Sequence, residues 1–124
     1  MNIWESGRES SLLDHIIAGR KTIEGRLDRD KFSHYRVGDI INIRRDIRNT
    51  QGELCDGETN AAQVEIIAIR NYPDFREMVK AEGYEHVIPD AVSYEEAAQE
   101  YDRYYSAEDQ ANHGVLAIEV RVIK

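Results

Sequence analysis

Apolar residues recur along the chain at two spacings, one helical and one alternating. Between Ser10 and Gly19 they lie three or four positions apart, which predicts a helix with one apolar face. Ser10 or Ser11 can cap the start of this helix, and Trp4 is expected to pack near it. Gly19 can supply the left-handed residue that ends it. Alternating or continuous apolar residues predict four strands, at residues 20–27, 39–45, 62–71 and 115–123.

Two more helices are predicted between the third strand and the last. Pro73 suits the first position of a helix that ends at Gly83, because the missing N–H of proline costs nothing there. Ser93 and Glu96 have the spacing of a capping box, which predicts a helix that runs to about Tyr105. Polar composition predicts loops at residues 28–34 and 46–59.

The order of these elements predicts the fold class. Strands that lie early, in the middle and last, with helices inserted between them, do not give a regular array of alternating strands and helices. They favour an α+β fold with a small mixed sheet or barrel. A chain of 124 residues is expected to form one domain, spanning residues 1–124.

Composition narrows the class of protein. The sequence has no apolar run long enough to span a membrane, and its first residues lack the basic and then apolar build of a signal peptide. We therefore expect a cytoplasmic protein without a membrane partner. Cys55 is the only cysteine, and the four histidines lack paired ligand spacing. We expect no metal site and no cofactor.

Charge is unevenly distributed in this acidic chain. The net charge of -8 argues against non-specific binding to nucleic acid. Residues 20–48, however, hold nine basic and five acidic residues, a net charge of +4, and the rest of the chain carries -12. A basic segment in an acidic protein suits a local phosphate contact better than a long duplex footprint. The alternative is that these charges only solvate two strands.

The most informative segment joins the first helix to the first strand. Strand alternation places the apolar Ile23 and Leu27 on one face, and Thr22, Glu24 and Arg26 on the other. Three polar groups on one strand face can form a preorganised site. The alternative is an amphipathic strand with a solvated face, in which the glutamate and the arginine form a structural ion pair.

Lys21 lies where the helix gives way to the strand, so its backbone is held from both sides. Its ammonium can contact a phosphate, and desolvation would lower its pKa and allow it to act as a base or nucleophile. The alternative is a solvent-facing lysine. Glu24 lies close in the chain and opposes that fall in pKa. We expect the pair to stay charged near neutral pH, which favours anion binding over catalysis.

Three segments together resemble the ASCH family. They are Gly-Arg-Lys-Thr-Ile-Glu-Gly-Arg-Leu at residues 19–27, Val-Gly-Asp at 37–39 and Gly-Val-Leu-Ala-Ile at 114–118. The resemblance extends over about residues 3 to 122. It implies a small PUA-like β-barrel with flanking helices and an association with RNA. The expected partner is therefore RNA or a modified nucleotide, bound in a cleft built on residues 19–27.

The resemblance also implies hydrolase activity as an alternative function. A small bacterial branch of the family consists of amidohydrolases of acetylated cytidine, which use a lysine, a threonine three positions later and a glutamate on a downstream helix. Lys21 matches the lysine, and Glu82 matches the glutamate. Glu24 stands at the threonine position, so the hydroxyl is lost there. Other members are ribonucleases. The implied catalytic set is Lys21, Glu24 and Glu82.

The predicted nucleic-acid contacts extend beyond this strand. Arg44 and Arg45 are expected at the rim of the cleft. Most tyrosines of the last long helix are expected to pack on the core, but an exposed one near its end can stack on a base. Tyr105 and Ser106 resemble a segment shared by family members of this length. The predicted binding set is Lys21, Thr22, Glu24, Arg26, Arg44, Arg45, Tyr105 and Ser106.

A further alternative is a protein-interaction domain. The stretch from Glu95 to Asp109 is acidic, and a partner protein that recognises the acidic C-terminal half is the expectation under this alternative. The sequence does not name such a partner.

Overall fold

The computed structural model describes residues 1–123, in which six strands, five α-helices and one 3-10 helix follow one another. The strands are β1 (Ile3–Glu9), β2 (Ile23–Leu27), β3 (Ile40–Arg48), β4 (Leu54–Asp56), β5 (Ala62–Tyr72) and β6 (Val115–Val122). The helices are α1 (Ser10–Ile17), η1 (Asp30–His34), α2 (Phe75–Glu82), α3 (Tyr84–Val87), α4 (Tyr94–Asp102) and α5 (Ala107–His113).

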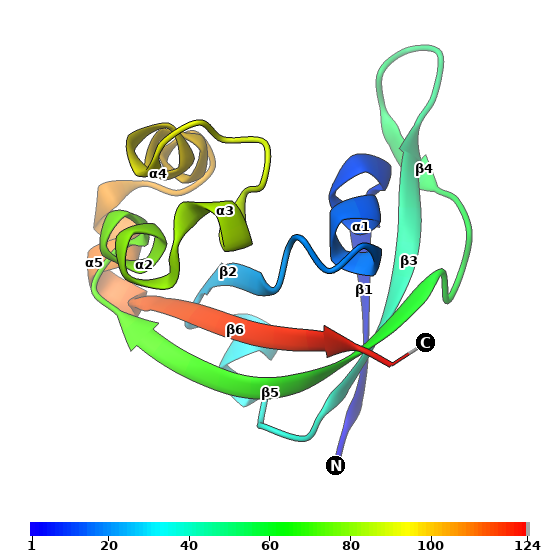
Figure 1. Cartoon of the computed structure of the whole chain (residues 1–124), viewed down its shortest axis with the longest axis horizontal. Helices are drawn as coiled ribbons and strands as arrows, with labels where there is room; N and C mark the ends of the chain where they lie inside the picture. The colour runs from blue at the N-terminus through cyan, green and yellow to red at the C-terminus, as the bar shows by residue number, and fades with distance from the viewer. Residues whose placement is uncertain (124) are drawn as a thin grey trace.

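The strands form one mixed, curved sheet in the order β1-β3-β5-β6-β2, and β4 pairs with β3 (Figure 1). Among the strands of residues 1–123, only the β1–β3 pairing is parallel. The predicted α+β class with a mixed sheet is confirmed, but the expected barrel is not, because the sheet stays open between β1 and β2. These two edge strands are linked instead by side chains, since Arg8 on β1 binds Glu24 on β2.

Strand β1 was not predicted, because its sequence, Ile-Trp-Glu-Ser-Gly-Arg-Glu, lacks a regular apolar alternation. It forms through pairing with β3, in a register that runs from Ile3 opposite Ile40 to Glu9 opposite Asp46. Such context outweighs the weak local preference of the residues for a strand. Trp4 lies on this strand and packs against Tyr35, with 5.1 Å between ring centroids, beside the core cluster that includes Leu13 and Ile16 of α1.

Several predicted boundaries move once tertiary contacts are present. The first strand begins at Ile23 rather than residue 20, and helix α4 ends at Asp102 rather than near Tyr105. Helix α2 begins after Pro73, because the side chain of Asp74 caps it by accepting a hydrogen bond from the backbone N–H of Glu77.

Two sequence signals for helix ends are confirmed. Gly19 after α1 and Gly83 after α2 both have positive φ, +80° and +91°, which other residues adopt at a cost. The capping box is confirmed in part, since the hydroxyl of Ser93 accepts a hydrogen bond from the backbone N–H of Glu96 at 3.1 Å.

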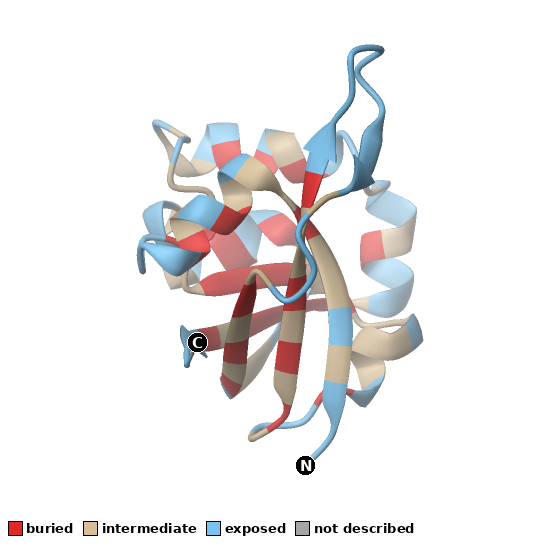
Figure 2. Ribbon diagram, turned by 90° about the vertical axis from the view of Figure 1, so that its right-hand side faces the viewer, coloured by how far each residue is buried: buried red, intermediate tan, exposed pale blue. Residues whose placement is uncertain are grey.

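Part of the predicted loop 46–59 is instead a hairpin of β3 and β4 that projects as an exposed arm (Figure 2).

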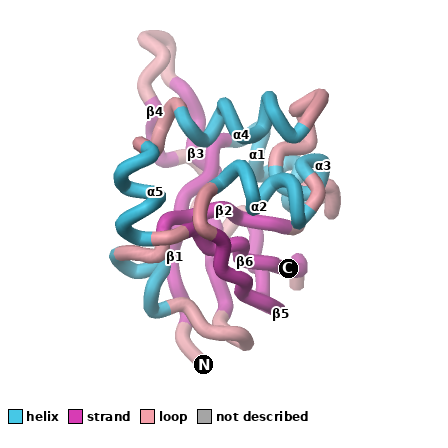
Figure 3. The backbone as a smooth tube through the Cα atoms, turned by 90° about the vertical axis from the view of Figure 1, so that its left-hand side faces the viewer, coloured by secondary structure: helices cyan, strands magenta, loops and turns pink. Residues whose placement is uncertain are grey.

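Two apolar clusters form the core. One lies inside the curve of the sheet, where Leu13 and Ile16 of α1 meet Ile41, Ile43 and other strand residues. The second joins β2 and β6 to the helices, which pack beside one another over this end of the sheet (Figure 3). Within residues 1–123, no helix has the length and apolar character needed to cross a membrane.

Candidate functional site

A pocket of about 450 Å³ opens between α1 and the α3–α4 region, beside the open seam of the sheet. Most of the side chains that line it are of three kinds. Charged residues form its floor: the buried Arg8, Lys21 and Glu24 and the partly buried Arg26. Tyrosines of α4 and the following segment form one wall: Tyr101, Tyr104 and Tyr105. Acidic residues that are at least partly exposed form its rim: Glu9, Asp90, Glu96 and Glu100.

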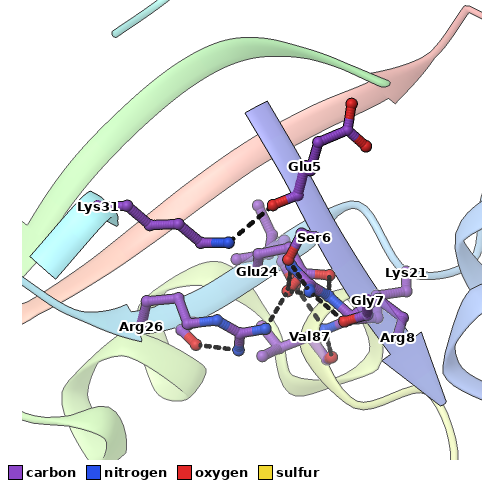
Figure 4. A network of polar contacts seen from close by, with 11 residues as sticks. Glu5, Ser6, Gly7, Arg8, Lys21, Glu24, Arg26, Lys31 and Val87 are labelled. Atoms are coloured by element: carbon purple, nitrogen blue, oxygen red, sulfur yellow. Dashed lines mark hydrogen bonds and ion pairs between the residues drawn. The ribbon is translucent and has the colours of Figure 1, made fainter. Parts of the chain in front are cut away.

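Glu24 lies between two arginines on the pocket floor (Figure 4). The Nε of Arg8 donates to both carboxylate oxygens at 3.0 Å, and Arg8 Nη2 lies 3.0 Å from Oε2. Nη2 of Arg26 lies 3.3 Å from the same Oε2. Burial alone would raise the pKa of Glu24, but the Arg8 guanidinium, with Lys21 and Arg26, holds it well below its usual range. The carboxylate is therefore ionised.

Lys21 points into the same floor from the junction of α1 and β2 (Figure 4). Its Nζ donates to the backbone carbonyls of Ile23 at 2.8 Å and Val87 at 2.6 Å. Burial lowers the pKa of Lys21 to about 8, although the Glu24 carboxylate opposes that fall. Burial thus outweighs the neighbouring carboxylate, yet the ammonium form still predominates at pH 7.

Arg26 carries the largest number of free donors on the floor. Its Nη1 donates to the Gly25 carbonyl at 2.9 Å, and its Nη2 contacts Glu24. Among residues 1–123, the other three of its five N–H groups have no partner. The ammonium of Lys21 likewise has one N–H beyond its two carbonyl bonds. With three cations and one carboxylate, the floor has a net charge of +2 and N–H groups available to an anion.

The tyrosine wall is anchored in the second core cluster. Tyr101 stacks on Phe75 with ring centroids 4.2 Å apart, and Tyr105 stacks on the same ring at 4.9 Å. The Tyr101 ring lies over Gly25 of β2, where any larger residue would collide with it. Tyr104, by contrast, is 74% exposed at the pocket mouth. The wall therefore combines two fixed rings with one exposed ring.

Four residues of the predicted binding set line the pocket: Lys21, Glu24, Arg26 and Tyr105. Thr22 adjoins them in sequence but does not line the pocket, and its backbone bonds to His86 and Val120. The hydroxyl of Ser106 caps α5 by accepting a hydrogen bond from the N–H of Asp109.

The two predicted strand arginines lie outside the pocket lining. Arg44 pairs with Asp46 at 2.6 Å and Asp56 at 3.2 Å. Arg45 pairs with Asp14 at 2.9 Å on the outside of α1. Both arginines are paired with carboxylates away from the pocket, so only part of the positive charge of residues 20–48 lies in the pocket.

Glu82, the proposed partner of Lys21 in catalysis, is also absent from the pocket lining. Its carboxylate accepts two hydrogen bonds from Arg70, at 2.6 and 2.7 Å, and one from the hydroxyl of Tyr72. The Arg70 guanidinium lowers the pKa of Glu82. The carboxylate beside Lys21 is that of Glu24.

Sequence reasoning missed Arg8, because strand β1 was not predicted and nothing local to Arg8 marks it as a buried residue. It also missed the loop wall at Val87, Ile88 and Ala91. Among residues 1–123, no group of three or more His, Cys, Asp or Glu side chains is arranged to hold a metal ion.

The fold and the pocket define a small α+β domain in which a buried charged cluster lies at the open edge of a mixed sheet. The ASCH domain family model matches residues 10–124. The chain belongs to the ASCH family, a PUA-like family.

Two solved structures resemble the chain over nearly its full length. The crystal structure of hypothetical protein PH0355 is 35% identical, with 98% of this chain and 99% of that one covered and a TM-score of 0.81. The solution structure of protein PF0455 from Pyrococcus furiosus is 35% identical, with 98% of each chain covered and a TM-score of 0.78.

A crystal structure of protein EF3133 from Enterococcus faecalis V583 shares the fold alone. It is 14% identical, with 99% of this chain and 76% of that chain covered and a TM-score of 0.57. No curated protein matches the chain.

Proposed function

We propose that the pocket binds one nucleotide, either free or as an unpaired residue of RNA, with a phosphate against Lys21 and Arg26. The observation that carries this proposal is the buried floor with a net charge of +2 and free N–H donors beneath a wall of tyrosines. Arginine and lysine donors suit phosphate oxygens, and aromatic faces suit bases of any sequence.

Size and charge favour a single nucleotide over a longer strand. A pocket of about 450 Å³ falls within the usual range of roughly 300–1,000 Å³ for small-molecule sites. Outside the floor, the acidic rim and the net charge of -8 repel a long polyanion. Affinity should therefore depend weakly on salt, with a slope of about -1, as expected for one or two phosphate contacts.

A comparison of two arginine variants tests the proposal by titration with mononucleotides and with labelled single-stranded RNA. Arg26→Gln removes the free donors, while Arg8 still holds Glu24, so the fold should persist. We expect affinity to fall about tenfold or more. Arg44→Gln, which removes a surface arginine outside the pocket, should bind like the wild type. Absence of saturable binding to every nucleotide and RNA at low salt would reject the proposal.

A second candidate is a hydrolase that acts on RNA or acetylated cytidine, and the lowered pKa of Lys21 favours it. With a pKa of about 8, roughly a tenth of the lysine is a neutral amine at pH 7, able to take a proton from water. Glu24, held ionised by two arginines, would orient the amine rather than supply a proton. Glu82 is engaged with Arg70 and is the less suitable partner.

Turnover of acetylated cytidine and of RNA by the wild type and by Lys21→Met tests this candidate. Methionine keeps the length of the side chain but has no amine. Activity of the wild type should rise with pH, with the midpoint of the rise near pH 8, and the variant should be inactive. Activity that survives in Lys21→Met would exclude this mechanism, and inactivity of the wild type would leave the binding proposal.

A further inference from the structure

We propose that the mouth of the pocket recognises the base, and that Tyr104, Glu96 and Glu100 together select guanine, most strongly when its ring carries a positive charge. This inference rests on the proposed function and adds the identity of the base to it. It starts from a contrast within one pocket, whose buried end is cationic and whose exposed end is acidic.

The opposed charges require a ligand with two different ends. A purely anionic ligand would gain at the floor and be repelled by the carboxylates of the rim. A nucleotide satisfies both ends only when its phosphate lies inward and its base offers N–H donors or positive charge outward. Guanine presents two adjacent donors, N1–H and the 2-amino group, which a carboxylate can accept together.

The rim carboxylates are available for this role. Glu96 accepts a long hydrogen bond of 3.4 Å from the N–H of Val92 through Oε1, and its Oε2 has no partner among residues 1–123. Glu100 pairs at 3.1 Å with Arg103, whose side chain is 71% exposed. Such an exposed ion pair contributes little, so a ligand can replace it at small cost.

Tyr104 supplies the stacking face. Its side chain is 74% exposed, and its hydroxyl makes no hydrogen bond within residues 1–123, so the ring is free to stack on a ligand. The face of an aromatic ring is electron-rich and attracts a cationic ring more strongly than a neutral one. A 7-methylguanine base, which carries a positive charge, should therefore bind more tightly than guanine. Uracil, whose single ring N–H lies between two carbonyls, places oxygen atoms against the carboxylates and should bind weakest.

Four mononucleotides test the inference by titration calorimetry: the 5′-monophosphates of guanosine, inosine, 7-methylguanosine and uridine. Inosine lacks only the 2-amino group of guanosine, so the two form a matched pair. We expect affinity to decrease from 7-methylguanosine to guanosine to inosine to uridine, with about a tenfold step for the lost amino group.

Variants locate the preference. Glu96→Gln and Glu100→Gln keep the shape of the rim and should reduce the guanosine-to-inosine ratio towards one. Glu95→Gln makes the same charge change on an exposed side chain of α4 outside the pocket lining and should leave the ratio unchanged. Tyr104→Ala should weaken every nucleotide, and the 7-methylguanosine form most of all.

The outcomes separate this inference from the function on which it rests. Equal binding of all four nucleotides, abolished by Arg26→Gln, would overturn the guanine preference and leave nucleotide binding in place. A guanosine preference that persists in both rim variants would also overturn it. Failure of every nucleotide to bind would overturn both proposals together.

Discussion

Burial decides the properties of the two ionisable residues at the centre of the pocket. Lys21 and Glu24 are both buried, and each is held by fixed partners, the lysine by two carbonyls and the glutamate by two arginines. Burial disfavours both charged forms. The arginines reverse this effect for the glutamate, but the lysine has no comparable compensation, and its pKa falls to about 8.

The lowered pKa of Lys21 predicts how stability depends on pH. The unfolded chain holds this proton up to the ordinary pKa of 10.5, whereas the folded protein releases it near 8. Between these values the unfolded state binds more protons, so Lys21 makes the free energy of unfolding rise with pH, by on the order of 3 kcal/mol.

Urea unfolding of the wild type and of Lys21→Met between pH 7 and 10 checks this dependence. The wild type should gain stability relative to the variant as pH rises. Parallel curves for the two proteins would contradict it.

Arg8 should be more important for stability than any surface arginine. Arg8→Met leaves Glu24 buried with a weaker set of partners, and loss of one member of a buried pair costs about 3–5 kcal/mol. Thermal unfolding should show a large loss for this variant and little change for Arg103→Met, whose ion pair with Glu100 is exposed. Equal losses of stability in the two variants would show that the buried Arg8–Glu24 pair contributes no more to stability than an exposed ion pair.

At the scale of elements, the sequence predicts the helices and strands whose formation depends on residues close together in the chain. The apolar face of α1, the alternation of β2 and the hydroxyl cap of α4 are contained in consecutive residues. These elements form as predicted, although β2 begins at Ile23 and α4 ends at Asp102. Strands β1 and β4 form through pairing with β3, and such a pairing cannot be predicted from the residues of one segment alone. Helix α2 begins at Phe75 rather than at Pro73, because the carboxylate of Asp74 caps the start of the helix.

Contact between elements also explains a glycine in the middle of β2. A Cβ on Gly25 would lie 2.7 Å from Met78 Cε and 2.7 Å from the Tyr101 hydroxyl. Gly25→Ala should therefore push the tyrosine wall outward, costing about 1–3 kcal/mol of stability and weakening nucleotide binding.

Adding Tyr101→Phe to Gly25→Ala removes the hydroxyl, one of the three atoms within 3.0 Å of the new Cβ, and should restore part of the stability. Calorimetric melting of the single and double variants checks this. A double variant no more stable than Gly25→Ala would show that the tyrosine hydroxyl is not the obstacle.

At the scale of the whole molecule, the open seam between β1 and β2 is both the departure from a barrel and the place where the pocket forms. In a closed barrel, backbone hydrogen bonds would occupy this space. Here Arg8 and Glu24 occupy it. The sequence placed Lys21, Glu24 and Arg26 together because they share one segment. It could not place Arg8 or the rim, which reach the site only through the curvature of the sheet and the packing of α4.

Hydrogen exchange should distinguish an open seam from a closed one. Amides of β5 and β6 that bond to neighbouring strands should exchange slowly. The N–H groups of β1 that point away from β3, and those of β2 that point away from β6, should exchange much faster. Uniformly slow exchange across β1 and β2 would indicate backbone pairing between these strands.

The two carbonyl bonds of Lys21 have a consequence for how one residue could serve two roles. An ammonium has three N–H bonds and an amine has two, so the carbonyls of Ile23 and Val87 can be satisfied in either state. Loss of the proton therefore leaves the side chain bonded to both carbonyls. What changes is the third position on Nζ, from an N–H that can donate to a phosphate oxygen to a lone pair that can act as a nucleophile or accept a proton. As the pH rises through 8, the Nζ of Lys21 changes from an ammonium that binds phosphate to an amine that can accept a proton. Nucleotide affinity should therefore fall over the same pH interval in which any turnover rises.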